Sequence, residues 1–282
     1  MPAPEKSGLN QTNRGPVGII AGAGVLPSAL ATACQKSGRG AVIVVLKGFA
    51  DPGAFSSFPS SLLSIGQGAR MVRFFRAHQV RDIVLIGAVR RPSLFDVRPD
   101  WWTLSRLGGI LLRGNLGDDG LLRAVRRVFE AEGFQICGVH DFLPDLLARS
   151  GALGAHTPSS DAMQDIVRGF TVAGALGQVD VGQSVVVQQG VVLGVEAAEG
   201  TAALIERCAT LKRSGPGPVL VKSVKPNQDR ALDLPTIGPD TVRAAVSAGF
   251  QGIAVQAGST LMVDPGEMAH LADAGGLFVW AQ

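Results

Sequence analysis

Short apolar runs alternate with helix-like segments through the first half of the chain. Each run is five or six residues long, which is too short for a buried helix, and three of them end at or beside a glycine. The runs are 17–22 (VGIIAG), 41–46 (AVIVVL), 61–65 (SLLSI) and 82–86 (DIVLI). Strands of a parallel sheet are buried on both faces and are therefore apolar throughout. With helices expected at 28–36 and 68–78, the alternation predicts βαβ units and a Rossmann-like parallel sheet.

The second half predicts a mixed sheet. A boundary is expected at 150–160 (SGALGAHTPSS), because small residues and helix breakers dominate this segment. The Gln189-Gly190 link between two apolar runs is a hairpin signal, so the second domain is expected to contain antiparallel strands. In the second half, helices are expected at 160–175, 200–211 and 239–248, and strands at 184–188, 191–195, 219–223 and 252–256, before an apolar tail at 277–280. The first half is expected to end with helices at 100–112 and 118–132 and a strand at 134–139.

The sequence thus predicts an α/β protein in three parts. At 282 residues the chain is long enough for two domains with separate cores. Residues 1–15 are expected to be a disordered lead-in, 16–150 a Rossmann-like domain and 151–282 a catalytic α/β domain, with a substrate cleft between the two domains. The lead-in lacks the apolar core of a signal peptide, and no apolar run approaches about 18 residues. A cytoplasmic location is therefore expected.

Charge and cysteine content narrow the functional classes. Lys and Arg number 26 against 23 Asp and Glu, a net charge of +3 that gives no sign of a nucleic-acid partner. Cys34, Cys137 and Cys208 lie far apart in apolar surroundings, which predicts buried thiols rather than a zinc site or a disulfide framework. Arginines around Trp101–Leu112 indicate solvated faces of amphipathic helices or a surface that approaches an anionic membrane.

Glycine-rich strand ends are the candidate ligand contacts of the first domain. Gly22, Gly24 and Leu26 lie in the loop AGAGVLP, which resembles half of a dinucleotide fingerprint. Pro27 replaces the third glycine, so a phosphate, sugar or uracil contact is favoured over NAD, with a structural tight turn as the alternative. Gln67 and Arg91 follow two further strands, where ligands of open α/β sheets bind, although Arg91 could equally be a surface residue.

The second domain carries the stronger chemistry. Gln183, Glu199 and Thr201 flank the hairpin strands, although Glu199 and Thr201 could also simply begin a helix. After the apolar strand comes the loop from Lys222 to Gly238, KSVKPNQDRALDLPTIG, in which Gln228 and Thr236 are candidate substrate contacts.

The charges of this loop suit metal-assisted attack on phosphorus. Asp229 and Asp233 are the candidate ligands of Mg²⁺ or another divalent cation, because hard cations take carboxylate and phosphate oxygens. Lys222 and Lys225 are candidate catalytic residues that would neutralise phosphate charge. An ordinary polar surface loop is the alternative.

Several motifs along the chain together resemble one enzyme family. AGAGVLP, GQGA, DIVLIGAVRRP, GDDGLL, DVGQSVVVQQGVVLGVEAAEGT and KPNQD…DLPTIGPDTV occur in this order from Val17 onward. They resemble the UDP-2,3-diacylglucosamine pyrophosphatases of the LpxI type. The last two blocks are the specific ones, since AGAG-x-LP alone is a weak signal.

The resemblance implies a cytosolic enzyme of lipid A biosynthesis. It would use Mg²⁺ to hydrolyse UDP-2,3-diacylglucosamine to 2,3-diacylglucosamine 1-phosphate (lipid X) and UMP, with lipid held between two α/β domains. Asp229 matches the family's essential acidic position and Asp233 its DLP aspartate. The family pattern QD-x-R-x-DLP places an arginine at 231, whereas this chain has Ala231 and carries Arg230 one position earlier.

Other functional classes stay open at this stage. The first domain could belong to a nicotinamide-dependent oxidoreductase, and the whole chain could bind a nucleotide sugar or a lipid without catalysis. A transient contact with the inner membrane surface and a homodimer are also open.

Overall fold

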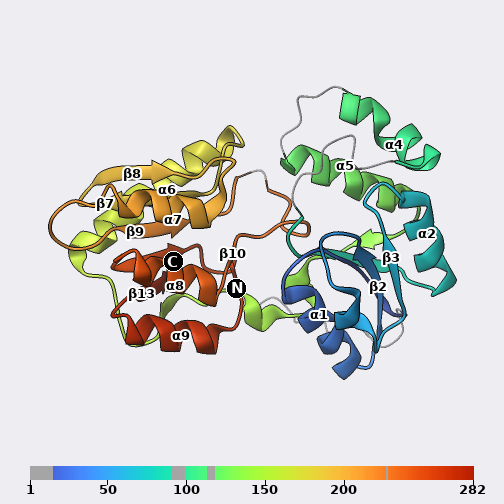
Figure 1. The fold of residues 1–282 in the computed structure, drawn as a ribbon, viewed down its shortest axis with the longest axis horizontal. Helices are drawn as coiled ribbons and strands as arrows, with labels where there is room; N and C mark the ends of the chain where they lie inside the picture. The colour runs from blue at the N-terminus through green and yellow to red at the C-terminus, as the bar shows by residue number, and fades with distance from the viewer. Residues whose placement is uncertain (1–14, 90–98, 113–117, 227) are drawn as a thin grey trace, which may run out of the picture. The chain divides into compact units, whose positions relative to one another are not determined.

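The computed structural model describes residues 15–89, 99–112, 118–226 and 228–282. The chain divides into two compact units, Met1–Leu143 and Pro144–Gln282 (Figure 1). The division falls ahead of the segment 150–160, and the described residues of each unit form a sheet of their own.

The described part of the N-terminal unit contains a parallel sheet, as predicted. Its strand order is β3-β2-β1-β4-β5, which matches the first strands of the doubly wound dinucleotide-binding order. The strands are β1 (Val17–Ala21), β2 (Ala41–Leu46), β3 (Ser60–Leu63), β4 (Asp82–Ile86) and β5 (Gln135–Ile136). Every residue of β1 and β2 is buried, which explains their unbroken apolar sequences. The strand expected at 134–139 is shorter, because the chain turns into a 3₁₀ helix at Val139–Asp141.

Helices flank this sheet in the expected order. They are α1 (Leu26–Lys36), α2 (Gly68–Ala77), α4 (Trp101–Leu112) and α5 (Asp118–Ala131), with a 3₁₀ turn at Pro52–Phe55. Asp100 joins two of them, since its carboxylate accepts from Thr103 N at 2.8 Å and from Ala69 N at 3.1 Å. The amino ends of α4 and α2 therefore share one capping carboxylate.

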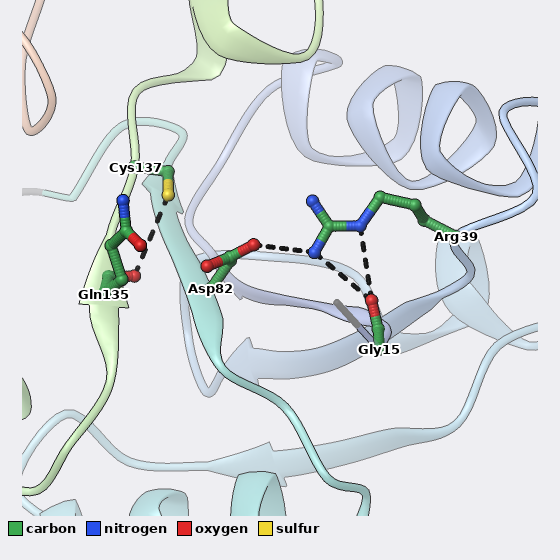
Figure 2. A network of polar contacts seen from close by, with 5 residues as sticks. All are labelled: Gly15, Arg39, Asp82, Gln135 and Cys137. Atoms are coloured by element: carbon green, nitrogen blue, oxygen red, sulfur yellow. Dashed lines mark hydrogen bonds and ion pairs between the residues drawn. The ribbon is translucent and has the colours of Figure 1, made fainter. Parts of the chain in front are cut away.

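A buried ion pair fastens the amino-terminal edge of this sheet. Arg39 Nη2 lies 2.7 Å from Asp82 Oδ2, and each side chain is 4% exposed (Figure 2). The same guanidinium donates to the Gly15 carbonyl from Nε and Nη2, each at 3.2 Å. Figure 2 also shows Cys137, which follows β5 and whose thiol points to the carbonyl of Gln135 two residues earlier. Arg39, which precedes β2, thus links the residue Gly15 ahead of β1 to Asp82, the first residue of β4.

The described part of the C-terminal unit contains the predicted mixed sheet. Its order is β6-β13-β11-β9-β7-β8, in which β13, β11 and β9 are parallel and the outer strands are antiparallel to their neighbours. The strands are β6 (Gly151–Leu153), β7 (Ser184–Gln188), β8 (Val191–Val195), β9 (Val219–Lys222), β11 (Gly252–Val255) and β13 (Phe278–Ala281). A separate parallel pair joins β10 (Thr236–Ile237) to β12 (Leu261–Met262).

Helices cover both faces of this second sheet. Helix α6 (Ser160–Gln178) packs on one face through Ile166 and Ala173, which meet alternate valines of β7 and β9. Helices α7 (Gly200–Ala209), α8 (Pro239–Ser247) and α9 (Pro265–Ala274) pack on the other face, and α8 and α9 lie side by side (Figure 1). The core of the unit therefore has two layers, one on each side of the strands.

The hairpin predicted at Gln189-Gly190 is confirmed. β7 and β8 are antiparallel, and both turn residues have positive φ, 50° and 74°, as a two-residue type I′ turn requires. The buried carboxylate of Asp165 accepts from the backbone N–H of Gln189 at 2.9 Å and of Gly190 at 2.6 Å. This carboxylate from α6 stabilises a left-handed conformation that Gln189 adopts at a cost.

Some elements went unpredicted. β6 lies within the segment expected to be a linker, while β10 and β12 are two-residue strands whose pairing depends on tertiary contacts. Helix α9 did have a local signal, because Asp264 caps it by accepting from Glu267 N at 3.2 Å and Pro265 occupies its first turn. The three cysteines are buried thiols, as expected. Among the described residues, no helix is long and apolar enough to cross a membrane.

Close packing of α6 on β9 gives a stability prediction with a matched control. A Cβ at Gly169 would lie 2.3 Å from Val221 Cγ2, so the Gly169→Ala substitution should lower the free energy of unfolding by about 1–3 kcal/mol. A Cβ at Gly174 of the same helix would meet nothing within 4 Å, so Gly174→Ala should raise it by up to about 1 kcal/mol. Urea unfolding measures both values. Equal effects of the two substitutions would contradict the packing described here.

Candidate active site

The sheet register of the C-terminal unit gathers polar residues at one edge. Lys222 ends β9 and pairs with Ser184, which begins the antiparallel strand β7. Glu196 follows the end of β8, and Gln256 follows the end of β11. Because β7 and β8 run in opposite directions, the start of one and the end of the other lie at the carboxyl edge of β9 and β11. This set of residues is called the polar edge below.

Lys222 is the central residue of the polar edge. Its side chain extends to the face that α7 covers, and the residue is only 7% exposed. Its ammonium Nζ donates to Thr201 Oγ1, in the first turn of α7, at 2.9 Å. Burial lowers the pKa of Lys222, while the nearby charges of Glu196 and Asp233 act in the opposite direction.

Glu196 binds the same Thr201 hydroxyl that accepts the hydrogen bond of Lys222. The Thr201 hydroxyl donates to Glu196 Oε1 at 2.7 Å, and Ser184 Oγ lies 3.5 Å from the same hydroxyl. Glu196 is 7% exposed, and its second oxygen, Oε2, is buried without a hydrogen-bond partner among the described residues. A buried ammonium and a buried carboxylate are thus joined through one hydroxyl group.

Two glutamine side chains hold the loop after β9, one by binding its start to the polar edge and one by bonds within the loop. Gln256 Oε1 accepts from Ser223 Oγ at 3.0 Å and from Val224 N at 3.3 Å. The buried Gln228 then closes the loop on itself, since its Oε1 accepts from Lys225 N at 3.0 Å and its Nε2 donates to Asp233 Oδ2 at 2.6 Å. Two glutamine amides therefore hold the backbone that carries the aspartates.

The two predicted metal ligands are brought to the same side of one turn. Leu232 N and Asp233 N both donate to the Asp229 carbonyl, at 2.9 and 3.0 Å. This helix-like turn places side chains four residues apart on one face, so Asp229 and Asp233 are neighbours. Asp229 Oδ1 also accepts from Ala231 N at 3.1 Å, and both aspartates are partly exposed.

The donor set suits a cation that substrate oxygens help to hold. Among the described residues, no group of three or more His, Cys, Asp or Glu side chains is gathered as in an all-protein metal cage. Mg²⁺ commonly uses one or two carboxylates together with phosphate oxygens and water. Asp229 and Asp233 on one turn fit that second arrangement, beside the positive charge of Lys222.

The other charged residues of the loop have structural contacts. Lys225 Nζ forms an ion pair with Asp180 Oδ1 at 2.6 Å, which ties the loop to the segment after α6. Arg230 is exposed and donates to the Gly258 carbonyl. Ala231, at the position where the family pattern has an arginine, is held by its backbone N–H on Asp229.

The predicted substrate contacts of this unit differ in their surroundings. Glu199 is paired with Arg207 at 2.8 Å, and its pKa is lowered first by its own backbone N–H and then by the Arg207 side chain. Gln183 Oε1 is buried and has no hydrogen-bond partner among the described residues. Thr236 begins β10, and its hydroxyl donates to the Leu234 carbonyl at 3.1 Å. Gln183 directly precedes Ser184 of the polar edge, and its Oε1 could accept a hydrogen bond from a ligand. Glu199 and Thr236, by contrast, already have local partners.

Gly22, in the first loop of the N-terminal unit, is explained by backbone packing. Ala23 and Ala88 exchange two backbone hydrogen bonds of 2.9 Å, which join the ends of β1 and β4. A Cβ at Gly22 would lie 2.7 Å from the Gly87 carbonyl oxygen, so Gly22 is required for this approach. The crevice between β1 and β4 is where doubly wound sheets bind dinucleotides, and here these hydrogen bonds cross it.

The remaining N-terminal predictions have different outcomes. Gly24 has a φ of +102° with open space around its Cα, and Leu26 begins α1. Gln67 precedes α2, and its Oε1 accepts from Ser64 N at 2.9 Å, so its side chain closes its own turn. Arg91 lies outside the described residues.

Sequence reasoning missed Glu196 and Gln256. The signal was present, because each is a polar residue that directly follows an apolar run and so lies at a strand end. Glu199 was chosen from the EAAE segment instead of Glu196, since the two cannot be separated without knowing where β8 stops and which carboxylate turns inward.

The Gln228 contacts give a stability prediction with a matched control. Gln228→Glu replaces the donor that faces Asp233 by a second carboxylate, so the free energy of unfolding should fall by about 1–3 kcal/mol at pH 8. Gln164→Glu, at an exposed position of α6, is the control and should stay near wild type. An effect of Gln228→Glu as small as that of the control would contradict this contact.

Known proteins match both halves of the chain. The model of the LpxI N-terminal domain matches residues 16–146, and that of the LpxI C-terminal domain matches residues 149–280. UDP-2,3-diacylglucosamine pyrophosphatase LpxI of Caulobacter vibrioides is 38% identical over 269 residues, which cover 93% of this chain and 96% of the relative.

Solved structures are more distant. CobK precorrin-6A reductase is 12% identical with a TM-score of 0.32, and covers 94% of this chain and 86% of its own. UDP-glucose 4-epimerase of Thermus thermophilus in complex with NAD is 13% identical with a TM-score of 0.31, and the match covers 94% of this chain and 85% of the epimerase chain. TM-scores this low carry no argument. Because both domain models match in order and a relative is 38% identical over nearly the whole chain, the chain belongs to the LpxI family.

Proposed function

We propose that this protein hydrolyses UDP-2,3-diacylglucosamine to 2,3-diacylglucosamine 1-phosphate (lipid X) and UMP, a step of lipid A biosynthesis. The observation that carries the proposal is the 38% identity, over 93% of this chain, to a relative named for this pyrophosphatase activity. The reaction adds the oxygen of water to one phosphorus and breaks the bond between that phosphorus and the bridging oxygen, which leaves with the other phosphate. The two protons of the water are carried by the two phosphate monoester products or released to solvent. The polar edge offers the kinds of groups that such a reaction needs.

The aspartates of the loop are proposed to act at the reacting phosphate. Asp229 and Asp233, on one face of a turn, would hold Mg²⁺ together with pyrophosphate oxygens or orient the attacking water. When bound, the cation would offset the charge that develops on the phosphate oxygens and assist departure of the leaving group. Gln228 keeps Asp233 in place through its 2.6 Å hydrogen bond.

The lysines are proposed to stabilise negative charge. Lys222 is buried, and charges act more strongly away from water, so its ammonium is the better candidate for contact with a phosphate oxygen. Lys225 is tied to Asp180 at 2.6 Å, which favours a role in holding the loop or in a weaker contact with substrate.

The substrate carries two acyl chains, which supports a transient contact with the cytoplasmic face of the inner membrane. In α4, Trp101 and Leu104 are exposed on adjacent turns, and Arg106 stacks over the Trp102 ring at 5.1 Å. Such exposed apolar groups beside arginine suit an anionic bilayer surface. Formation of a homodimer stays a prediction.

A direct assay tests the proposal. Purified protein is incubated with UDP-2,3-diacylglucosamine and Mg²⁺, or with EDTA, and UMP is measured by chromatography. We expect release of UMP with Mg²⁺ and its loss with EDTA. Asp229→Ala should lower kcat by about 100-fold or more, because the carboxylate acts on the reacting groups.

The matched control is Asp145→Ala, since this carboxylate is 87% exposed and pairs with a surface arginine. It should keep wild-type turnover. Absence of UMP from the wild type would overturn the pyrophosphatase, and binding without turnover would support a carrier. Undiminished turnover in EDTA would overturn the metal dependence alone.

A further inference from the structure

We infer that Glu196 and Thr201 are positioning residues, which hold the ammonium of Lys222 at the site through a one-way hydrogen-bond relay. Glu196 is not among the site residues that the sequence predicts, and Thr201 is predicted there only as a substrate contact. The kinetic consequence of this inference rests on the proposed function, which assigns Lys222 to a phosphate oxygen of the substrate.

The direction of the relay follows from the chemistry of its members. A carboxylate only accepts, so the single hydroxyl proton of Thr201 is donated to Glu196 Oε1 at 2.7 Å. The Thr201 oxygen is then left as an acceptor, and the Lys222 ammonium, which only donates, points to it at 2.9 Å. Neither bond can be reversed without losing both.

The three residues come from elements whose positions are fixed independently. Lys222 ends β9, Thr201 lies in the first turn of α7 and Glu196 follows β8. A Cβ at Gly182 would lie 2.0 Å from the Glu196 carbonyl oxygen, so the backbone of Glu196 packs directly on that glycine. The carboxylate therefore has a rigid base from which to orient the hydroxyl.

The relay leaves the lysine partly unsatisfied, as a substrate-binding cation should be. An ammonium has three N–H groups, and among the described residues Thr201 accepts the hydrogen bond of one of them. A lysine side chain has many rotamers, and without the Thr201 acceptor it could turn toward the carboxylates of Glu196 or Asp233. The hydroxyl thus separates the two charges and directs the remaining N–H groups.

Glu199 does not share this role. It is three residues further along, exposed, and bound to Arg207 and to the backbone of its own turn. The neighbouring carboxylates of the EAAE segment therefore differ, with one facing the buried lysine and the other capping a surface arginine.

Substitutions at Thr201 and Glu196 test the relay by kinetics. Thr201→Val removes the hydroxyl at nearly constant volume, and kcat should fall by up to about a hundredfold while KM changes little, since the misplaced ammonium fails in the transition state. Thr201→Ser restores the hydroxyl and should recover most of the rate. Glu196→Gln keeps an acceptor but loses the charge, and its rate should lie between the two.

A second measurement does not depend on turnover. Ligand-free protein is treated briefly with acetic anhydride, and the labelling of Lys222 is compared by peptide mass spectrometry with that of the exposed Lys36 and Lys47. Thr201→Val should lower the labelling of Lys222, because its ammonium turns toward the carboxylate of Glu196 or Asp233 and forms an ion pair there, whereas Thr201→Ser should match wild type. If wild type releases no UMP, the proposed function fails and this measurement still decides the relay.

Two controls separate positioning from damage to the fold. Glu206→Gln on the exposed side of α7 and Thr171→Val on the exposed side of α6 make the same chemical changes elsewhere, and both should behave as wild type. Thermal unfolding verifies that each variant is folded. The relay is overturned if folded Thr201→Val keeps wild-type labelling of Lys222, or if Thr201→Ser is as impaired as Thr201→Val.

Discussion

A buried ammonium constrains the arrangement of the C-terminal unit. Burying Lys222 costs free energy unless its charge is compensated, and the compensation has to come from neighbouring elements. Thr201 and Glu196 supply it through hydrogen bonds, and the nearby charge of Asp233 adds to it. Strand β9, the end of β8, the start of α7 and the loop after β9 must therefore all meet at this one side chain.

The mixed sheet is what allows this meeting. A purely parallel sheet presents only strand ends at its carboxyl edge, whereas the hairpin of β7 and β8 also brings a strand start there, with Ser184 opposite Lys222. Asp165 on α6 holds the turn at Gln189, so a helix on one face of the sheet helps to fix the register of β7 and β8. These strands in turn place Ser184 and Glu196 near Lys222, whose side chain lies on the opposite face. The loop aspartates depend in the same way on the Gln228 amide, which is itself buried.

Local patterns predicted most of the regular structure but fewer of the contacts. Continuous apolar runs and the Gln189-Gly190 turn predicted the strands and the hairpin, because burial on two faces and positive φ leave direct marks in the sequence. Strands β10 and β12, of two residues each, have no such mark and pair only because the chain brings them together. The sequence leaves a ligand contact and a structural tight turn open for Gly22, and only the structure shows its packing against Gly87.

By itself the sequence determined the α/β class, the hairpin and the group of charged residues between Lys222 and Gly238, since these follow from apolar periodicity, turn chemistry and local composition. Only the tertiary structure decided which of these charges face one another. It paired Lys225 with Asp180, turned Glu196 rather than Glu199 toward Lys222, and gave Thr201 its place between them. The physical reason is that such contacts join residues distant in sequence, and the register of the strands sets their geometry.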